Sequence, residues 1–180
     1  GNRNRYGDAL WSGLATHTVQ AEYLGGLTEQ LAETGNPGQV LREVFKPAQR
    51  ETDQAVLQSI ATHFSRHSLQ EVLESLERAA PSDEFAAKTL ATMRTRSPTS
   101  LAVAFRQITT GSTLSMDECM RMEFRIVNRM VAGHDFYEGI RAVLIDKGST
   151  PVWRPATLDD LDPAEIDAYF APLPGGDLDL

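Results

Sequence analysis

The sequence predicts a mainly α-helical chain with one short strand near its N-terminus. After about residue 20, apolar residues recur at helical spacing in nearly every segment, and Ser, Asn or Asp residues that suit helix N-caps precede several of these segments. Residues 14–19 alternate between apolar and polar types and include β-branched residues, which favours a strand. We therefore expect about eight short helices, whose apolar stripes pack against one another or against a sheet outside this chain.

Composition limits the classes of function. The chain has 180 residues, 41% of them hydrophobic and 23% charged, which is typical of a globular protein. Its net charge of −8 argues against general nucleic-acid binding and against binding to anionic membranes. Cys119 is the single cysteine, so an intrachain disulfide and a cysteine zinc cage are excluded, and we expect a reducing, cytoplasmic location. No apolar run suggests a membrane span or signal peptide.

The N-terminal segments begin with the predicted strand, which runs from Leu14 to Val19 after Gly13. A helix is expected from Glu22 to Glu33, closed by Gly35 as a C-cap. Asn36 suits an N-cap and Pro37 the first position of the next helix, because no helical hydrogen bond needs the missing N–H there. The chain also begins on Gly rather than Met, so we expect a further part upstream.

The middle of the chain reads as a series of helices separated by clear breaks. A helix is expected over residues 56–64, and the capping box Ser68–Glu71 starts another; we expect these two to form a helical hairpin. A third helix follows Pro81-Ser82, and a fourth begins at Ser97-Pro98 and stops at Gly111.

The C-terminal segments begin with a long helix that a second capping box, Ser115–Glu118, starts. Gly133 is expected to be its C-cap. An amphipathic segment is expected from Asp135 to Ile145, and a last short helix from Asp162, before a Gly-rich acidic tail. The expected apolar stripe of the long helix comprises Met116, Met120, Phe124, Val127 and Val131.

His63 and His67 have the four-residue spacing of helical zinc ligands. The residue after the first histidine is Phe64 rather than the Glu of a metalloprotease, and no third ligand stands nearby. We interpret the pair as two near-surface histidines at a helix end, and we expect no metal ligands in the chain.

Arg121, Arg125 and Arg129 recur every four residues and form a cationic stripe, with Asp117 placed for an ion pair with Arg121. We expect a solvated or subunit-facing surface; contact with an acidic partner or a phosphorylated ligand is the alternative. Cys119 lies beside the apolar stripe of the same helix and is expected to be a small buried hydrophobe.

The sequence contains no nucleophile elbow, phosphate-binding loop, dinucleotide-binding glycine turn or Cys/His metal cluster. We therefore expect no catalytic residue in this chain. The segment Gly133–Lys147 has a structural interpretation: Asp135 can cap a helix, Glu138 lies in its first turn, and Lys147 closes its far end.

Four ordered blocks resemble the crotonase (enoyl-CoA hydratase/isomerase) superfamily, most closely its 3-hydroxyisobutyryl-CoA hydrolase branch. The blocks are Asp8-Ala9 with Gly13-Leu14-Ala15-Thr16-His17, then Ser97-Pro98-Thr99-Ser100-Leu101, then Gly133-His134-Asp135-Phe136-Tyr137-Glu138-Gly139 with Arg141-Ala142-Val143-Leu144-Ile145-Asp146-Lys147, and finally Pro151-Val152-Trp153-Arg154-Pro155-Ala156. The single basic residue after Asp146 is similar to the hydrolase pattern, whereas hydratases usually carry an acid-Lys-Arg run.

The resemblance implies that this chain is the helical C-terminal region of a crotonase-type α/β fold, with residues 1–20 ending the core and residues 21–180 forming the helical region. In that family an oxyanion hole and carboxylates act on an acyl-CoA thioester, and all of them belong to the core upstream. Lys147 matches the family's terminal lysine and is the candidate contact to a CoA phosphate. The implied partners are the upstream core, acyl-CoA and further copies of the protein, with no cofactor beyond the CoA thioester substrate.

Two alternatives stay open at this point. One is an enoyl-CoA hydratase or isomerase of the same superfamily. The other, from a different class, is a free-standing helical module that binds a protein partner.

Overall fold

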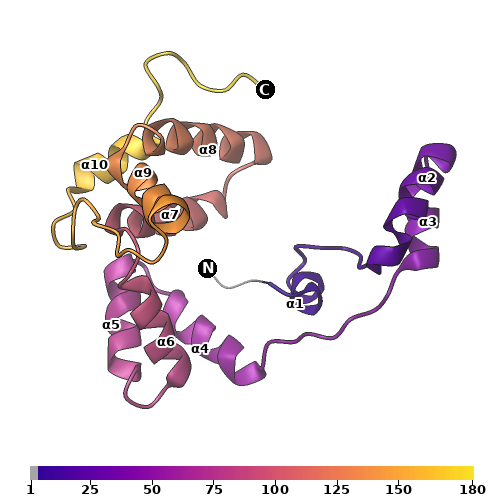
Figure 1. The fold of residues 1–180 in the computed structure, drawn as a ribbon, viewed down its shortest axis with the longest axis horizontal. Coiled ribbons are helices and arrows are strands. Elements are labelled where there is room, and N and C mark those ends of the chain that lie inside the picture. Colours follow the sequence, from indigo (N-terminus) through magenta and orange to yellow (C-terminus); the bar gives the residue numbers. More distant parts are fainter. Residues whose placement is uncertain (1–3) are drawn as a thin grey trace. The chain divides into compact units, whose positions relative to one another are not determined.

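A computed structural model describes residues 4–180, and it contains helices joined by turns and extended segments (Figure 1). The chain divides into two compact units, residues 1–61 and 62–180. The helices are α1 (Tyr6–Trp11), the 3-10 turn η1 (Ala21–Tyr23), α2 (Leu24–Thr34), α3 (Pro37–Val44), α4 (Gln54–Phe64), α5 (Leu69–Ala79), α6 (Glu84–Met93), α7 (Pro98–Gly111), α8 (Met116–Met130), α9 (His134–Ile140), the π-helical turn η2 (Arg141–Ile145) and α10 (Pro163–Phe170). The prediction of a mainly helical chain is confirmed. The division expected at residue 20 stays a prediction, and residues 1–3 of that first segment lie outside the described residues.

The strand predicted over residues 14–19 is wrong, because no segment of residues 4–180 is a strand. A strand needs a neighbouring strand with which it exchanges repeated backbone bonds. Here the backbone of the segment has isolated bonds instead: the Ala15 N–H donates to the Ala9 carbonyl, and the Thr18 carbonyl accepts from the Lys46 N–H at 3.0 Å. Alternation in the sequence could not supply the missing partner strand.

In the N-terminal unit, α1 is held against the segment at residues 49–52. Asp8 accepts hydrogen bonds from the backbone N–H groups of Glu51 and Thr52, both at 2.9 Å, and from the Thr52 hydroxyl at 2.7 Å. These three donors lower the pKa of Asp8 below its usual range, the Thr52 hydroxyl contributing most. Gly7 is buried and lies so close to this segment that a Cβ there would stand 2.0 Å from the Gln49 carbonyl oxygen. The sequence Gly7-Asp8 therefore fixes how α1 docks.

The predicted helix starts and stops of the chain are largely confirmed. Gly35 closes α2 with φ +60°, which is left-handed backbone, and the Asn36 side chain accepts from the Gln39 N–H at the start of α3. The capping box at Ser115 is complete. At Ser68 only half of the expected box forms, because the Glu71 carboxylate accepts from the His67 N–H instead of the Ser68 N–H.

The C-terminal unit contains two apolar clusters. In the first, Val72 and Leu76 of α5 are completely buried against Ala86 and Leu90 of α6. The tight hairpin of this unit is thus α5–α6, and not the expected pairing of the helix at 56–64 with α5. The second cluster joins α7, α8 and α10 around Val103, Met122 and Ile126, with Ile166, Tyr169 and Phe170 packed against it.

The apolar stripe predicted for α8 is wrong. The side of α8 that packs on α7 carries Met122 and Ile126, whereas Met116 is 73% and Val127 51% exposed. Apolar residues occur around most of this helix, so periodicity alone could not identify the side that meets α7.

The helix end predicted at Gly133 is also corrected. α8 ends at Met130 with Val131, an ordinary right-handed residue, as its C-cap; Gly133 has φ −89° and ψ 161°, so it is the extended N-cap residue of α9. Within residues 4–180 no helix is long and apolar enough to cross a membrane.

Candidate functional site: a carboxylate clamp and the adjoining pocket

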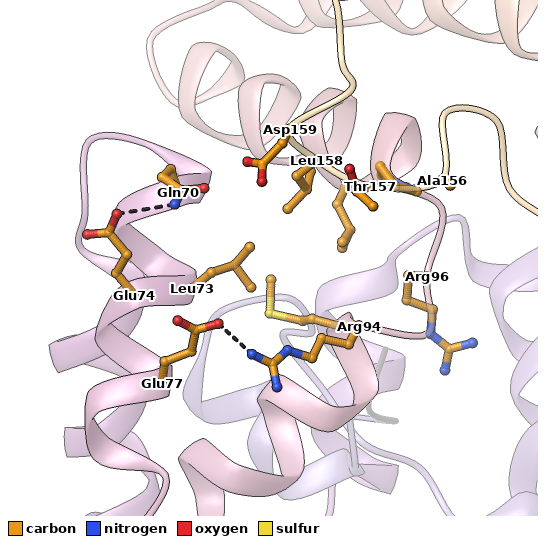
Figure 2. Close-up of a pocket in the computed structure, with 13 residues that line it drawn as sticks. Gln70, Leu73, Glu74, Glu77, Arg94, Arg96, Ala156, Thr157, Leu158 and Asp159 are labelled. Carbon is orange, nitrogen blue, oxygen red and sulfur yellow. Dashed lines mark hydrogen bonds and ion pairs between the residues drawn. The ribbon is translucent and has the colours of Figure 1, made fainter.

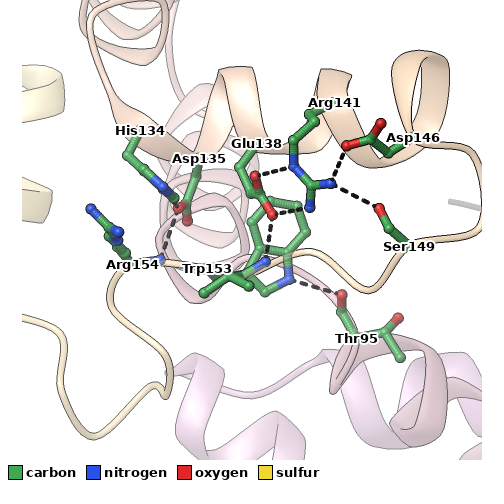
Figure 3. A network of polar contacts seen from close by, with 10 residues as sticks. Thr95, His134, Asp135, Glu138, Arg141, Asp146, Ser149, Trp153 and Arg154 are labelled. Carbon is green, nitrogen blue, oxygen red and sulfur yellow. Dashed lines mark hydrogen bonds and ion pairs between the residues drawn. The ribbon is translucent and has the colours of Figure 1, made fainter.

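Asp135, in the first turn of α9, is the first of two carboxyl groups that organise this site (Figure 3). Its side chain is 8% exposed. One oxygen accepts from the Ser97 hydroxyl at 2.6 Å, and the other accepts from the Arg154 N–H at 2.9 Å and lies 3.0 Å from Nδ1 of His134. The prediction that Asp135 caps α9 is therefore wrong, because its side chain points to other segments of the chain.

Glu138 is the second carboxyl group, one helical turn further along α9. Both of its oxygens accept from the Arg141 guanidinium, at 2.7 and 2.8 Å, and one also accepts from the Val152 N–H at 2.7 Å. The hydrogen bonds from Arg141, followed by the one from Val152, lower the pKa of Glu138 to about 2. The same pairing, with a further bond to Asp146 at 2.8 Å, raises the pKa of Arg141. Glu138 is thus a charged anchor at neutral pH.

Together, Asp135 and Glu138 form what we call the carboxylate clamp. Asp135 accepts a hydrogen bond from the Arg154 N–H, and Glu138 accepts one from the Val152 N–H. These two N–H groups are two residues apart, and alternate N–H groups of an extended segment point the same way. Between them, the Trp153 indole donates to the Thr95 carbonyl at 3.0 Å. Gly139 lies under this ring, where an added Cβ would stand 3.6 Å from it. The clamp therefore joins α9, the start of α7 and the segment at residues 151–155 into one assembly.

A pocket of about 360 Å³ adjoins the clamp (Figure 2). Its walls come from α5, from the end of α6, from the turn that leads into α7 and the first turn of α7, and from residues 156–159, which continue directly from the clamped segment. Leu73, Met93 and Leu158 supply apolar surface, and an ion pair of 2.5 Å between Glu77 and Arg94 spans one side. The clamp thus fixes the position of one wall of this pocket.

Lys147, the predicted CoA contact, lies just beyond η2 and is exposed. The structure does not bring it into the clamp. The Arg141 guanidinium, which binds Glu138, donates to the neighbouring Asp146 and Ser149, and no hydrogen bond joins it to Lys147. Its role stays a prediction. Next to it, Val143, Leu144 and Ile145 of η2 are 68%, 64% and 72% exposed, an unusual run of uncovered apolar residues.

The two histidines do not share a helical face. α4 ends at Phe64, so His67 lies beyond it and is exposed, whereas His63 is 5% exposed. His63 Nδ1 lies 2.8 Å from the Ser75 hydroxyl and its Nε2 lies 3.7 Å from Asp83. The expectation that both are near the surface is therefore wrong for His63. Among residues 4–180 no group of three or more His, Cys, Asp or Glu side chains could hold a metal ion.

The arginine stripe of α8 is covered by the chain's own C-terminal region. Arg125 binds Asp177 through two nitrogens, and Arg129 donates to the Tyr169 and Pro172 carbonyls at 3.3 and 3.1 Å. The expected Asp117–Arg121 pair does not form among the described residues; Nε of Arg121 donates to the Leu178 carbonyl instead. The face expected to be solvated or subunit-facing thus contacts the chain's own C-terminal residues, and a contact with another subunit stays a prediction.

Cys119 is partly buried, and its thiol lies 3.7 Å from the Gly111 carbonyl, as suits a small packed side chain.

Sequence reasoning missed the partners of the clamp. The spacing of Glu138 and Arg141, three residues apart on a helix, is a signal that could have predicted their ion pair. No local signal predicted that Ser97, Thr95 and Trp153 would meet there.

Comparisons with known proteins agree with this helical architecture. The family model described as enoyl-CoA hydratase/isomerase matches residues 1–170. The mitochondrial 3-hydroxyisobutyryl-CoA hydrolase of Xenopus laevis is 35% identical over 190 residues, which cover 100% of this chain and 49% of that protein. The protein of the same name from Danio rerio is 36% identical over 178 residues, covering 93% and 46%. The chain thus spans about half the length of these relatives, and it corresponds to their C-terminal half.

Two solved structures superpose closely. An enoyl-CoA hydratase from Rhodobacter sphaeroides 2.4.1 aligns with a TM-score of 0.78 and 28% identity, over 100% of this chain and 51% of that one. A carnitinyl-CoA dehydratase from Mycobacterium thermoresistibile aligns with a TM-score of 0.77 and 27% identity, over 94% and 48%. These matches set aside the alternative of an unrelated free-standing helical module. The chain belongs to the enoyl-CoA hydratase/isomerase (crotonase) family.

Proposed function

We propose that this chain is the C-terminal half of an acyl-CoA thioester hydrolase that acts on 3-hydroxyisobutyryl-CoA or a similar short, branched 3-hydroxyacyl thioester. The observation that carries the proposal is the 35 to 36% identity to hydrolases of that name over at least 93% of the chain. In this reaction water adds to the thioester carbonyl, the carbon–sulfur bond breaks, and the products are the free acid and the CoA thiol.

The acid–base groups of this reaction belong to the preceding half of the protein. Within the clamp, Glu138 is held as an anion by Arg141, and Asp135 is engaged by Ser97 and the Arg154 N–H. A general base must be free to take a proton from water, and neither carboxyl group is. The clamp instead gives the helical half a fixed shape.

The contribution of this chain is to complete the acyl-CoA site by covering the core. Val143, Leu144 and Ile145 supply the apolar surface that docks on the preceding half, since such a run is costly to leave in water. Lys147, two residues after Ile145, contacts a phosphate of CoA as a point charge. Further copies of the protein are the proposed oligomeric partners. The expected cytoplasmic location stays a prediction, and the Xenopus laevis and Danio rerio hydrolases named above are mitochondrial proteins.

Product analysis on the intact protein tests the proposal. The protein is incubated with 3-hydroxyisobutyryl-CoA and, separately, with crotonyl-CoA; free thiol and acyl-CoA products are then measured by mass spectrometry. We expect CoA to be released from 3-hydroxyisobutyryl-CoA, and crotonyl-CoA to be neither hydrated nor hydrolysed to a comparable extent. Hydration of crotonyl-CoA without release of thiol would overturn the proposal in favour of an enoyl-CoA hydratase, which the solved structures make the second candidate.

The role of Lys147 has its own test in the same protein. Lys147→Ala removes one charge from a phosphate contact, so we expect KM for the CoA thioester to rise about tenfold with kcat unchanged, as for a loss of about 1.4 kcal/mol of binding. Lys88→Ala is the matched control, because Lys88 is an exposed helical lysine paired with Glu84. An unchanged KM in Lys147→Ala would refute the assignment.

A further inference from the structure

The C-terminal tail, residues 171–180, passes near α8 in the same compact unit (Figure 1), and it contacts the arginines of that helix. Two nitrogens of Arg125 bind the two carboxylate oxygens of Asp177, and its third donates to the Phe170 carbonyl at 3.1 Å. This planar, two-point contact is the geometry by which arginine recognises carboxylates in general. The Asp177 contact lowers the pKa of that carboxyl group.

A cavity of about 330 Å³ lies beside this contact. Leu114, Met122 and Phe170 supply its apolar lining, and Arg121 and Arg125 supply cationic groups. Its volume is at the lower end of the range of about 300–1,000 Å³ that is usual for small-molecule sites. Phe170 is itself covered by the Arg106 guanidinium, 4.4 Å above the ring, which holds this wall in place.

The terminal nitrogens of Arg121 remain available to bind an anion at the cavity. Nε of Arg121 donates to the Leu178 carbonyl, and within residues 4–180 its two terminal nitrogens have no hydrogen-bond partner. Glu118 is the one acidic residue among the described lining residues, and one oxygen of its carboxylate accepts from the Ser115 hydroxyl and N–H, at 2.7 and 2.8 Å. Among the described lining residues, the cavity therefore offers two guanidinium groups against one carboxylate, together with apolar surface.

We propose that this cavity binds a small organic carboxylate with an apolar body, and that Asp177 is an internal competitor that occupies the Arg125 guanidinium in its absence. The ligand's carboxylate replaces that of Asp177 on Arg125 and gains the terminal nitrogens of Arg121. Its body lies against Leu114, Met122 and Phe170, and the tail is released. The proposal does not depend on the thioester chemistry proposed above.

A fluorinated probe, 4-fluorobenzoate, tests the site through its fluorine NMR signal on the full chain. Asp177→Ala removes the competitor, so we expect the Kd of the probe to fall at least tenfold. Asp179→Ala is the matched control, because it removes the same charge from the same tail, and Asp179 has no partner within the described residues. We expect its Kd to stay within twofold of the unmodified protein.

Two further measurements locate the binding. In the Asp177→Ala background, Arg121→Gln should weaken binding at least tenfold while the far-ultraviolet circular dichroism is unchanged. With carbon-labelled methionine methyls, the probe should shift the Met122 signal and leave that of Met116, which is 73% exposed, in place. Equal affinities in the Asp177→Ala and Asp179→Ala variants, or binding without a shift at Met122, would overturn the proposal.

Discussion

Replacing Ser97 by Ala removes two hydrogen bonds that lie at the junction of α7 and the carboxylate clamp. The Ser97 oxygen accepts from the Ser100 N–H at 3.1 Å, which caps α7, and its hydroxyl donates to Asp135 at 2.6 Å. Ser97 is 4% exposed and the Asp135 side chain 8% exposed, so water cannot easily replace either bond.

The expected loss of stability is the sum of two effects. Loss of an N-cap costs about 1 kcal/mol. Leaving one buried oxygen of Asp135 without its donor adds about 1–3 kcal/mol. We therefore expect Ser97→Ala to lower the free energy of unfolding of this unit by about 2–4 kcal/mol.

Ser68→Ala is the matched control for this substitution. Ser68 caps α5 through the Glu71 N–H at 3.1 Å, also in the C-terminal unit, but its hydroxyl has no clamp partner. Its loss should cost about 1 kcal/mol. Urea unfolding is followed by fluorescence of Trp153 in a Trp11→Phe background, which leaves one of the two tryptophans of the chain. Equal costs for the two serine substitutions would refute the idea that the Ser97–Asp135 bond anchors the clamp.

Three further predictions concern other parts of the chain. Gly7→Ala should destabilise the N-terminal unit by about 1–3 kcal/mol, because its Cβ would meet the Gln49 carbonyl at 2.0 Å. Gly26→Ala, within α2 and with no atom within 4 Å, should stabilise the same unit by about 1 kcal/mol. Urea unfolding monitored by circular dichroism should therefore show changes of opposite sign in the unfolding free energy of the two variants. The pKa of Glu138 falls from 4.5 to about 2 on folding, so its stabilising effect should be complete above pH 4.5 and be lost as the pH falls toward 2; the difference in urea midpoint between the unmodified protein and Glu138→Gln should vanish across that window, and a constant difference would contradict the pairing. Leu76→Ala, at a fully buried site, should cost about 3–4 kcal/mol, against about 0.5 or less for Ile108→Ala at a site 74% exposed, and comparable losses in the unfolding free energy would contradict the core described above.

Helix boundaries were predictable because their causes are local. Asn36, Ser97 and Ser115 each accept an N–H three residues ahead, so the signal and its effect lie in the same few residues. The strand at residues 14–19 failed for the opposite reason, since a strand depends on a partner elsewhere in the chain. For α8, apolar residues lie on several sides, so the packed face depends on the position of α7, which the sequence of α8 alone does not specify.

The candidate site was predictable as a segment but not as a set of contacts. The motif around Asp135 and Glu138 pointed to the family, and the comparisons confirm it. The backbone N–H groups that the two carboxyl groups accept belong to Val152 and Arg154, 14 and 19 residues further along the chain. Such pairings depend on the path of the intervening loop, which helical periodicity does not describe.

The most direct test of the account compares the isolated chain with the intact protein in one assay, the release of CoA thiol from 3-hydroxyisobutyryl-CoA. We propose that the oxyanion hole and the acid–base groups lie in the preceding half of the protein, and that the clamped helical half described here completes the site. We expect turnover by the intact protein and none by residues 1–180 alone, even at high concentration of the chain. Turnover by the isolated chain, or an intact protein that binds the thioester without releasing CoA, would contradict it.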